Sequence, residues 1–257
     1  MEIQVQSTRL AALRGDLLAL GLFQEAGKSN LRGAAKDADR ALGGLIGEII
    51  DSKDFLGRAQ ETFVFHPRGS LGVKRVLLVG LGKKKEFSAD AVRLAAATAG
   101  AVAQRKRISS FLLIPFGLGE AGGRKISPEA MGQALAEGLI LGTYQFSEYK
   151  SRPKKGKPGE EERDEAPAPD LKQVTLALPD GGPAKGIAAG VATGRVVSES
   201  VVFVRNLANR PSSTHSPAYL AKEAAAMARQ VGLRCRVLEK PDMERLGMGG
   251  LLGVARG

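Results

Sequence analysis

Residues 204–217 read VRNLANRPSSTHSP, and this stretch divides the sequence into two parts. Val201 and Val204 close an apolar pattern of helical spacing, which predicts the end of a helix. Pro211 cannot continue that helix because proline has no backbone N–H group. Ser216 is followed by a proline, the pairing of an N-cap with proline at the first helical position, so we expect a new helix there.

The residues after this stretch predict the order helix, strand, helix. The first helix covers residues 218–230, and its apolar face consists of Leu220, Ala224, Met227 and Val231. A short strand follows at 234–238, and a second proline-started helix begins at Pro241. The glycine-rich tail GMGGLLGVARG ends the sequence. This order is typical of the opening of an α/β domain.

Upstream of the dividing stretch, the apolar pattern predicts a mixed sheet with helices on its faces. We expect strands at 2–6, 17–23, 62–65, 76–79, 111–116 and 174–178, the first at a sheet edge and the third and fourth forming a hairpin. We expect helices at 31–50, 88–107, 127–141 and 184–208. Gly43 and Gly44 are a weak point in the first of these helices.

One segment does not fit either element type. Residues 150–170, KSRPKKGKPGEEERDEAPAPD, contain four prolines and no aromatic or β-branched residue, so they cannot contribute to a core. We interpret them as a flexible surface loop with a basic half and an acidic half. The sequence therefore predicts a first domain at 1–180, a linker helix at 181–210, and the start of a second domain at 211–257.

The segment from Asn206 to Gly257, with its Asn-x-Pro turn, Ser-Pro helix start and LGMGGLLGVARG tail, resembles the entry to the catalytic domain of the leucyl aminopeptidase (cytosol aminopeptidase) family. The residues before it resemble that family's N-terminal domain, so the resemblance covers essentially the whole chain. Ser213 stands where the family often has asparagine, and Ser216 where it often has threonine. Serine caps a helix as well as threonine does, so the turn is retained.

The resemblance implies an α/β first domain that is similar to macro domains. It also implies a hexameric hydrolase that removes N-terminal residues from peptides with two divalent ions, usually zinc or manganese. Paired ions of this kind activate a water and stabilise the tetrahedral intermediate. In such an enzyme the first domain would serve assembly and access to the active site.

The family's metal ligands and catalytic residues, a lysine and several carboxylates, lie in motifs beyond the point that matches Gly257. We therefore expect no catalytic, cofactor-binding or metal-binding residue within 1–257, no ion bound by this chain, and no peptidase activity from it alone. The apolar residues of the tail would normally pack inside a larger domain. We expect them to be exposed here or buried by another chain.

Composition is that of a soluble globular protein, with 43% hydrophobic and 25% charged residues. The sequence has no run of about 18 apolar residues, and MEIQVQSTRL is neither a signal peptide nor a transit peptide. We expect a cytoplasmic protein without membrane contact. The single cysteine, Cys235, excludes an internal disulfide and a cysteine-based zinc site, and its place in a predicted strand favours a packing role. His66 and His215 form no metal-binding motif.

Three glycine-rich stretches are incomplete nucleotide motifs. GLFQEAGKS has Leu22 where a P-loop needs glycine, and VLLVGLGKKK has Lys85 where GxGxxG needs its third glycine. Gly117, Gly119 and Gly122 do satisfy GxGxxG. The next helix begins too late for its N-terminal amides to meet a pyrophosphate, so a plain loop is favoured.

The net charge of +11 comes from two segments, residues 51–109 with 12 basic and 5 acidic residues and residues 171–257 with 12 and 6. The simplest interpretation of the triplets 83–85 and 105–107 is solubility and helix-dipole stabilisation. Alternatively, both triplets share one face and segment 74–107 contacts nucleic-acid phosphates. A second alternative is a non-catalytic module that binds an ADP-ribose-type ligand through the glycine loop 117–123.

Overall fold

The computed structural model describes residues 1–24, 31–69, 71–118, 126–150 and 170–256. Two compact units, Met1–Phe203 and Val204–Gly257, make up the chain, and we describe each by itself. The division falls within the predicted linker helix. Apart from its two end residues, the predicted loop 150–170 lies outside the described residues.

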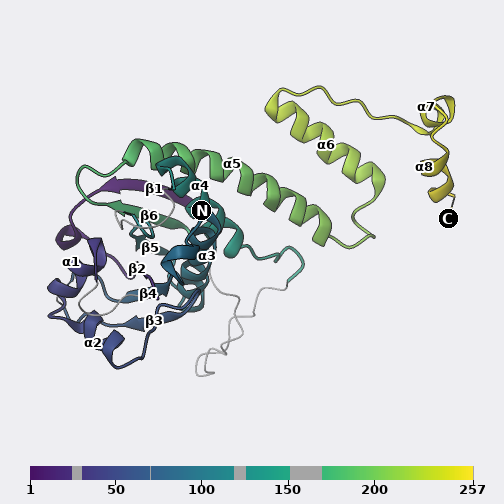
Figure 1. Ribbon diagram of the computed structural model, residues 1–257. Coiled ribbons are helices and arrows are strands. Elements are labelled where there is room, and N and C mark those ends of the chain that lie inside the picture. Colours follow the sequence, from purple (N-terminus) through teal and green to yellow (C-terminus); the bar gives the residue numbers. More distant parts are fainter. Residues whose placement is uncertain (25–30, 70, 119–125, 151–169, 257) are drawn as a thin grey trace, which may run out of the picture. The chain divides into compact units, whose positions relative to one another are not determined.

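The first unit is built on a six-stranded sheet of order β1-β6-β5-β2-β4-β3 (Figure 1). Its strands are β1 (Glu2–Ser7), β2 (Leu18–Leu22), β3 (Thr62–Phe65), β4 (Val76–Gly80), β5 (Ser110–Leu113) and β6 (Gln173–Leu178). All neighbours are parallel except β3 and β4, which are antiparallel. The predicted mixed sheet is confirmed, with its first strand at one edge and a hairpin at the other.

Among the described residues, five helices cover the two faces of this sheet (Figure 1). They are α1 (Gly33–Ala41), α2 (Leu45–Asp51), α3 (Ala89–Arg105), α4 (Pro128–Gly142) and α5 (Ala184–Asn209). Leu17 and Ala19 pack with α3, α4 and α5 on one face, while Leu18 and Leu20 pack with α1 and α2 on the other. This alternation follows from the two-residue period of a strand, and it makes the unit a three-layer α/β/α structure.

The predicted single helix over 31–50 is wrong, because two helices occupy this range. Gly43 and Gly44 separate α1 from α2 with φ values of 69° and 94°. This left-handed conformation is accessible to glycine at little cost and ends a right-handed helix. The Asp39 carboxylate accepts a hydrogen bond from the Gly47 amide at 3.0 Å and so stabilises the start of α2.

Helices α4 and α5 approach closely through glycines. A Cβ atom added at Gly190 would lie 1.9 Å from the Glu129 carbonyl oxygen, and one added at Gly132 would lie 2.1 Å from the Ile187 carbonyl oxygen. Each helix therefore presents a glycine to the backbone of the other. The sequence predicted both helices but gave no sign of this contact.

The second unit contains the end of α5 and the helices α6 (Pro217–Val231), α7 (Lys240–Arg245) and α8 (Gly249–Val254). The predicted cap at Ser216 is confirmed, since its side chain accepts a hydrogen bond from the Tyr219 amide at 3.2 Å. The predicted strand 234–238 is wrong, because its residues pair with no other segment among those described. A strand needs a partner for its backbone hydrogen bonds. Cys235 is exposed instead of packed.

This unit contains little core of its own. Among the described residues 204–256, Ala228 is the one buried hydrophobic residue. Large apolar side chains are open to solvent, including Leu233 at 62% and Val254 at 86% exposure. Within this chain the tail residues Leu246, Leu251 and Val254 are exposed, and whether another chain covers them stays a prediction.

By length and composition, α5 is the one helix among the described residues that could cross a membrane. It also has a packed side, where Ile187, Gly190 and Val191 are buried. A core helix of a soluble protein meets the same criteria, so this helix alone is weak evidence for a membrane span.

Candidate functional site

The carboxyl ends of the parallel strands in the first unit lie side by side, and the order of the strands reverses between β2 and β5. The chain continues from β2 toward β4 on one side and from β5 toward β6 on the other, although β2 and β5 are neighbours. In open α/β sheets, ligands bind in the crevice outside the carboxyl ends of such strands. One hollow lies in this region, and a second adjoins it but is partly lined by Arg14, Gly69, Leu71 and Gly72, which precede β2 and β4.

We call the first hollow the strand-end cavity, and its volume is about 520 Å³. The residues that follow β1, β5 and β6 line it together with the first turns of α1. Its buried wall includes Leu13 and Leu178, and partly buried apolar side chains extend that wall. The lining residues are Thr8, Arg9, Leu10, Leu13, Gly33, Ala34, Asp37, Ile114, Leu118 and residues 177–183.

An ion pair lies among these lining residues. Because β1 and β6 are parallel and Ser7 is in register with Leu178, the residues two positions further on, Arg9 and Asp180, come together. The Arg9 Nε group donates a hydrogen bond to Asp180 Oδ2 at 3.1 Å. Both side chains are mostly exposed, at 85% and 60%, so this pair contributes little to stability.

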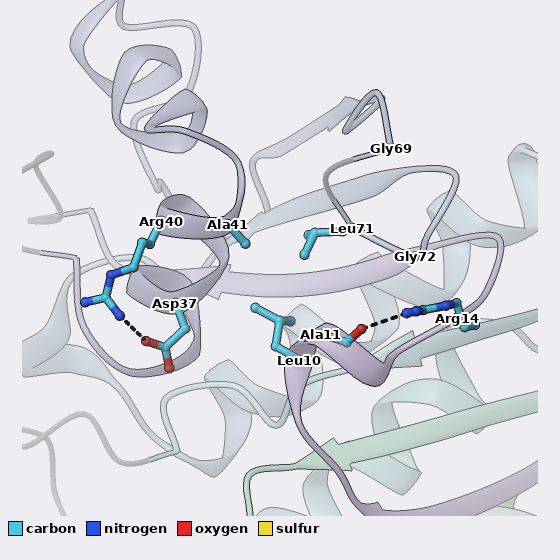
Figure 2. A pocket seen from close by; sticks show the side chains of 9 residues that line it. All are labelled: Leu10, Ala11, Arg14, Asp37, Arg40, Ala41, Gly69, Leu71 and Gly72. Carbon is cyan, nitrogen blue, oxygen red and sulfur yellow. Dashed lines mark hydrogen bonds and ion pairs between the residues drawn. The ribbon is translucent and has the colours of Figure 1, made fainter.

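We call the second hollow the arginine cavity (Figure 2), and its volume is about 580 Å³. The Arg14 guanidinium donates to the Ala11 carbonyl oxygen at 2.7 Å, which holds this side chain against its own loop. On the other side of the cavity, Arg40 Nη1 lies 3.7 Å from Asp37 Oδ1. Figure 2 shows the Arg40 side chain pointing toward that carboxylate. Leu10 and Asp37 line both cavities, so the two hollows adjoin.

The described residues do not fit a metal centre, because no three His, Cys, Asp or Glu side chains among them come together. His66 Nδ1 lies 3.0 Å from the Lys74 carbonyl oxygen, which gives this histidine a structural partner. His215 belongs to the second unit, and its ring lies 5.8 Å from that of Tyr219. The prediction that metal ligands lie outside residues 1–257 stays a prediction.

One carboxylate among the described residues has a lowered pKa, but it lies at the amino end of β2 and does not line the strand-end cavity. A hydrogen bond from Lys74, and then the charge of that lysine, lower the pKa of Asp16 below its ordinary value. The two side chains are 2.6 Å apart at the amino end of β2. This pair joins the segments before β2 and β4, so we assign it a structural role and not a chemical one.

The basic triplets are separated by a helix. Residues 83–85 precede α3, whereas residues 105–107 lie at its C-terminal end. A helix of 17 residues is about 25 Å long. The triplets therefore do not form one continuous basic cluster, and nucleic-acid binding by segment 74–107 stays a prediction from the sequence.

The glycine motifs gain no support from the described residues. Residues 25–30 and 119–125, which contain the glycine of the first motif and most of the third, lie outside those described. Gly117 has a φ of 70°, and a Cβ atom there would lie 2.6 Å from the Phe87 ring. This glycine is therefore explained by core packing.

Sequence reasoning missed the charged residues of the strand-end cavity, namely Arg9, Asp37 and Asp180. A signal for two of them was available, because Arg9 and Asp180 each follow a predicted strand by a few residues. Polar residues after parallel strands gather at one edge of a sheet. The parallel pairing of the first strand with the last was the missing information.

Comparison with known proteins gives one consistent family. Residues 19–153 match the model of the cytosol aminopeptidase family, N-terminal domain, and residues 202–257 match that family's catalytic domain. The chain is 34% identical over 257 residues to a probable cytosol aminopeptidase of Alkaliphilus metalliredigens, and 35% identical to that of Syntrophotalea carbinolica. It aligns over its full length but spans only 48% of each relative.

Solved structures give the same fold. A mutant of tomato leucine aminopeptidase aligns with 96% of this chain at a TM-score of 0.75 and 21% identity, and the match covers 46% of that structure. The bottromycin maturation enzyme BotP in complex with Mn aligns with 92% of this chain at a TM-score of 0.65 and 24% identity, covering 41% of the other chain. These matches confirm the predicted α/β fold class.

Proposed function

Because this chain belongs to the cytosol aminopeptidase family, we propose that it forms the N-terminal part of an exopeptidase that removes N-terminal residues from peptides. One observation carries the proposal. The N-terminal and catalytic domain models match in order along the chain, and the relatives align with all of it. The relatives are named cytosol aminopeptidases, which supports a cytoplasmic location.

The metal chemistry of this activity is assigned to another part of the protein. One structural neighbour is described in complex with Mn, which supports a divalent ion in the complete enzyme, and the family resemblance makes manganese or zinc the expected ion. Such ions supply a water activated for attack on the peptide carbonyl. The described residues of this chain hold no cluster able to bind them. We therefore derive no catalytic step from residues 1–257.

The role proposed for this chain rests on the family resemblance, and the two units differ in how much core they contain. The first unit has a continuous core on both faces of its sheet, whereas the second unit leaves most of its apolar residues open. We assign the first unit to assembly, with a hexamer as the expected state, and to control of access to the active site. The second unit is the entry to the catalytic domain.

The test is a peptidase assay on two proteins. The chain of residues 1–257 and the protein purified from its native source are each incubated with a leucyl anilide and Mn²⁺ or Zn²⁺, and the intact mass of the native protein is measured. We expect a native mass well above 27.0 kDa, metal-dependent release by that protein, and none by residues 1–257.

Any of three results would contradict the proposal. Metal-dependent release by pure residues 1–257 would show that the metal site lies within this chain. A longer native protein without peptidase activity would remove the exopeptidase assignment. If the native mass is 27.0 kDa, the alternative of a non-catalytic binding module replaces it.

A further inference from the structure

We propose that the strand-end cavity binds the zwitterion of a free apolar α-amino acid, such as leucine. The cavity combines an apolar wall with a positive and a negative side chain. A free apolar amino acid carries three matching groups: an apolar side chain, a carboxylate and an ammonium group. The link to leucine as a product of peptide cleavage rests on the proposed function. The existence of the site does not, because it is argued from the cavity alone.

The apolar part of the site is formed by side chains from four segments of the chain. Leu13 and Leu178 are buried in the wall, and Ile114 and Leu118 are partly buried beside them. A volume of about 520 Å³ is within the range of small-molecule sites, roughly 300–1,000 Å³. An aliphatic side chain that enters this hollow is removed from water, which favours binding.

The polar part of the site is the ion pair of Arg9 and Asp180. Within the described part of the chain, Arg9 makes one hydrogen bond, through Nε, so its Nη groups are open to a ligand carboxylate. Asp180 accepts that bond through Oδ2, which leaves Oδ1 for a ligand ammonium group. Charge-assisted hydrogen bonds of both kinds are stronger than neutral ones.

The charge balance disfavours a phosphorylated ligand. Two carboxylates, Asp37 and Asp180, and one guanidinium, Arg9, line the cavity. Asp180 already pairs with Arg9. Asp37 in turn pairs with Arg40, which lies outside the lining. A diphosphate would therefore meet no cation without a carboxylate partner among the lining residues, whereas a zwitterion satisfies a cationic and an anionic group at once. An ADP-ribose-type ligand is therefore the competing outcome and not the proposal.

The experiment is an NMR titration of the isotope-labelled chain of residues 1–257 with leucine, followed through its backbone amide signals. Three probes each lack one group: isopentylamine has no carboxylate, 4-methylpentanoate has no amine, and glycine has no apolar side chain. We expect leucine to bind with a millimolar Kd and to shift the signals of Gly33, Gly181 and Gly182. Each probe should bind about tenfold more weakly or worse, because it loses a charge-assisted bond or the apolar contact.

Substitutions on the exposed pair test the polar contacts without disturbing the fold. Arg9→Gln and Asp180→Asn should each weaken leucine binding about tenfold, the size expected for one charge-assisted hydrogen bond. Arg195→Gln is the matched control, because Arg195 and Glu199 form an exposed ion pair at 2.7 Å on α5 outside the cavity. This control should leave the Kd unchanged.

Three outcomes would overturn the proposal. These are no binding of leucine, binding that the Arg9 and Asp180 substitutions do not alter, and binding of ADP-ribose to the same amides without binding of leucine. None of them bears on peptidase activity, which is measured separately on the native protein. Failure of the amino-acid site and failure of the exopeptidase assignment are thus distinguishable.

Discussion

Glu137 is the one buried carboxylate among the described residues, with 6% exposure, and it connects two helices. Its Oε2 accepts a hydrogen bond from Arg93 Nε of α3 at 2.6 Å, and its Oε1 accepts one from Gln133 on its own helix at 2.8 Å. Arg93 also contacts Asp90, whose side chain is 83% exposed. One guanidinium therefore pairs with a buried and an exposed carboxylate.

These two carboxylates should differ in their effect on stability. We expect Glu137→Ala to lower the free energy of unfolding by about 2–3 kcal/mol, because it leaves Arg93 and Gln133 without their partner and opens space between α3 and α4. Asp90→Ala is the control and should cost under about 1 kcal/mol, as exposed ion pairs do. Urea unfolding measures both. If both variants lose the same free energy of unfolding, burial does not make the Glu137 contacts more stabilising than the exposed Asp90 contact.

At the same scale, local signals predicted helix caps but not the charged residues of the cavity. Ser88, Ser127 and Ser216 each accept a hydrogen bond from the amide three residues on, as expected of a serine before a helix. Arg9 and Asp180 are 171 positions apart, and they meet because β1 and β6 pair in one register. That register follows from the whole sheet, so no local pattern contains it.

At the scale of elements, sequence patterns succeeded where an element is buried on both faces. The runs that form β2 and β4 are almost continuously apolar, which is typical of central parallel strands. The failures have separate causes. Gly43 and Gly44 split a helix that an unbroken apolar stripe predicted, and residues 234–238 have strand-like composition but no partner strand among the described residues.

The close contact between α4 and α5 predicts that the one methyl group added by Gly190→Ala destabilises the first unit. In an exposed helix, Gly→Ala stabilises by roughly 1 kcal/mol because alanine restricts the unfolded chain. At Gly190 the added Cβ would lie 1.9 Å from the Glu129 carbonyl oxygen, so the helices must move apart. We expect Gly190→Ala to destabilise the first unit by about 1–3 kcal/mol in urea unfolding.

The control for this prediction lies in the same helix. Ala192 is exposed, so Ala192→Gly should cost only the helix propensity, about 1 kcal/mol. The two substitutions are opposite in chemical direction, yet both should destabilise. If Gly190→Ala is neutral or stabilising, the close approach of the two helices is absent in solution.

At the scale of the whole molecule, the two units should differ in stability. Ordering the backbone costs about 1–2 kcal/mol per residue, and burial of apolar surface must offset that cost. The first unit has a core on both sides of its sheet, whereas Ala228 is the one buried hydrophobic residue among the described residues 204–256. An isolated helix of 15 residues, the length of α6, is only marginally stable in water.

Hydrogen–deuterium exchange, resolved by peptide in a monomeric sample of residues 1–257, tests this difference directly. Amides of α6 should exchange through openings of nearly zero free energy, while those of α3 should exchange only through opening of the first unit. In a native protein that extends past residue 257, as proposed, α6 should become protected, because further chain would cover Leu220, Met227 and Val231, which are exposed here. Equal protection of α6 and α3 in the monomer would mean that the second unit folds on its own, and its apolar residues would then need no partner.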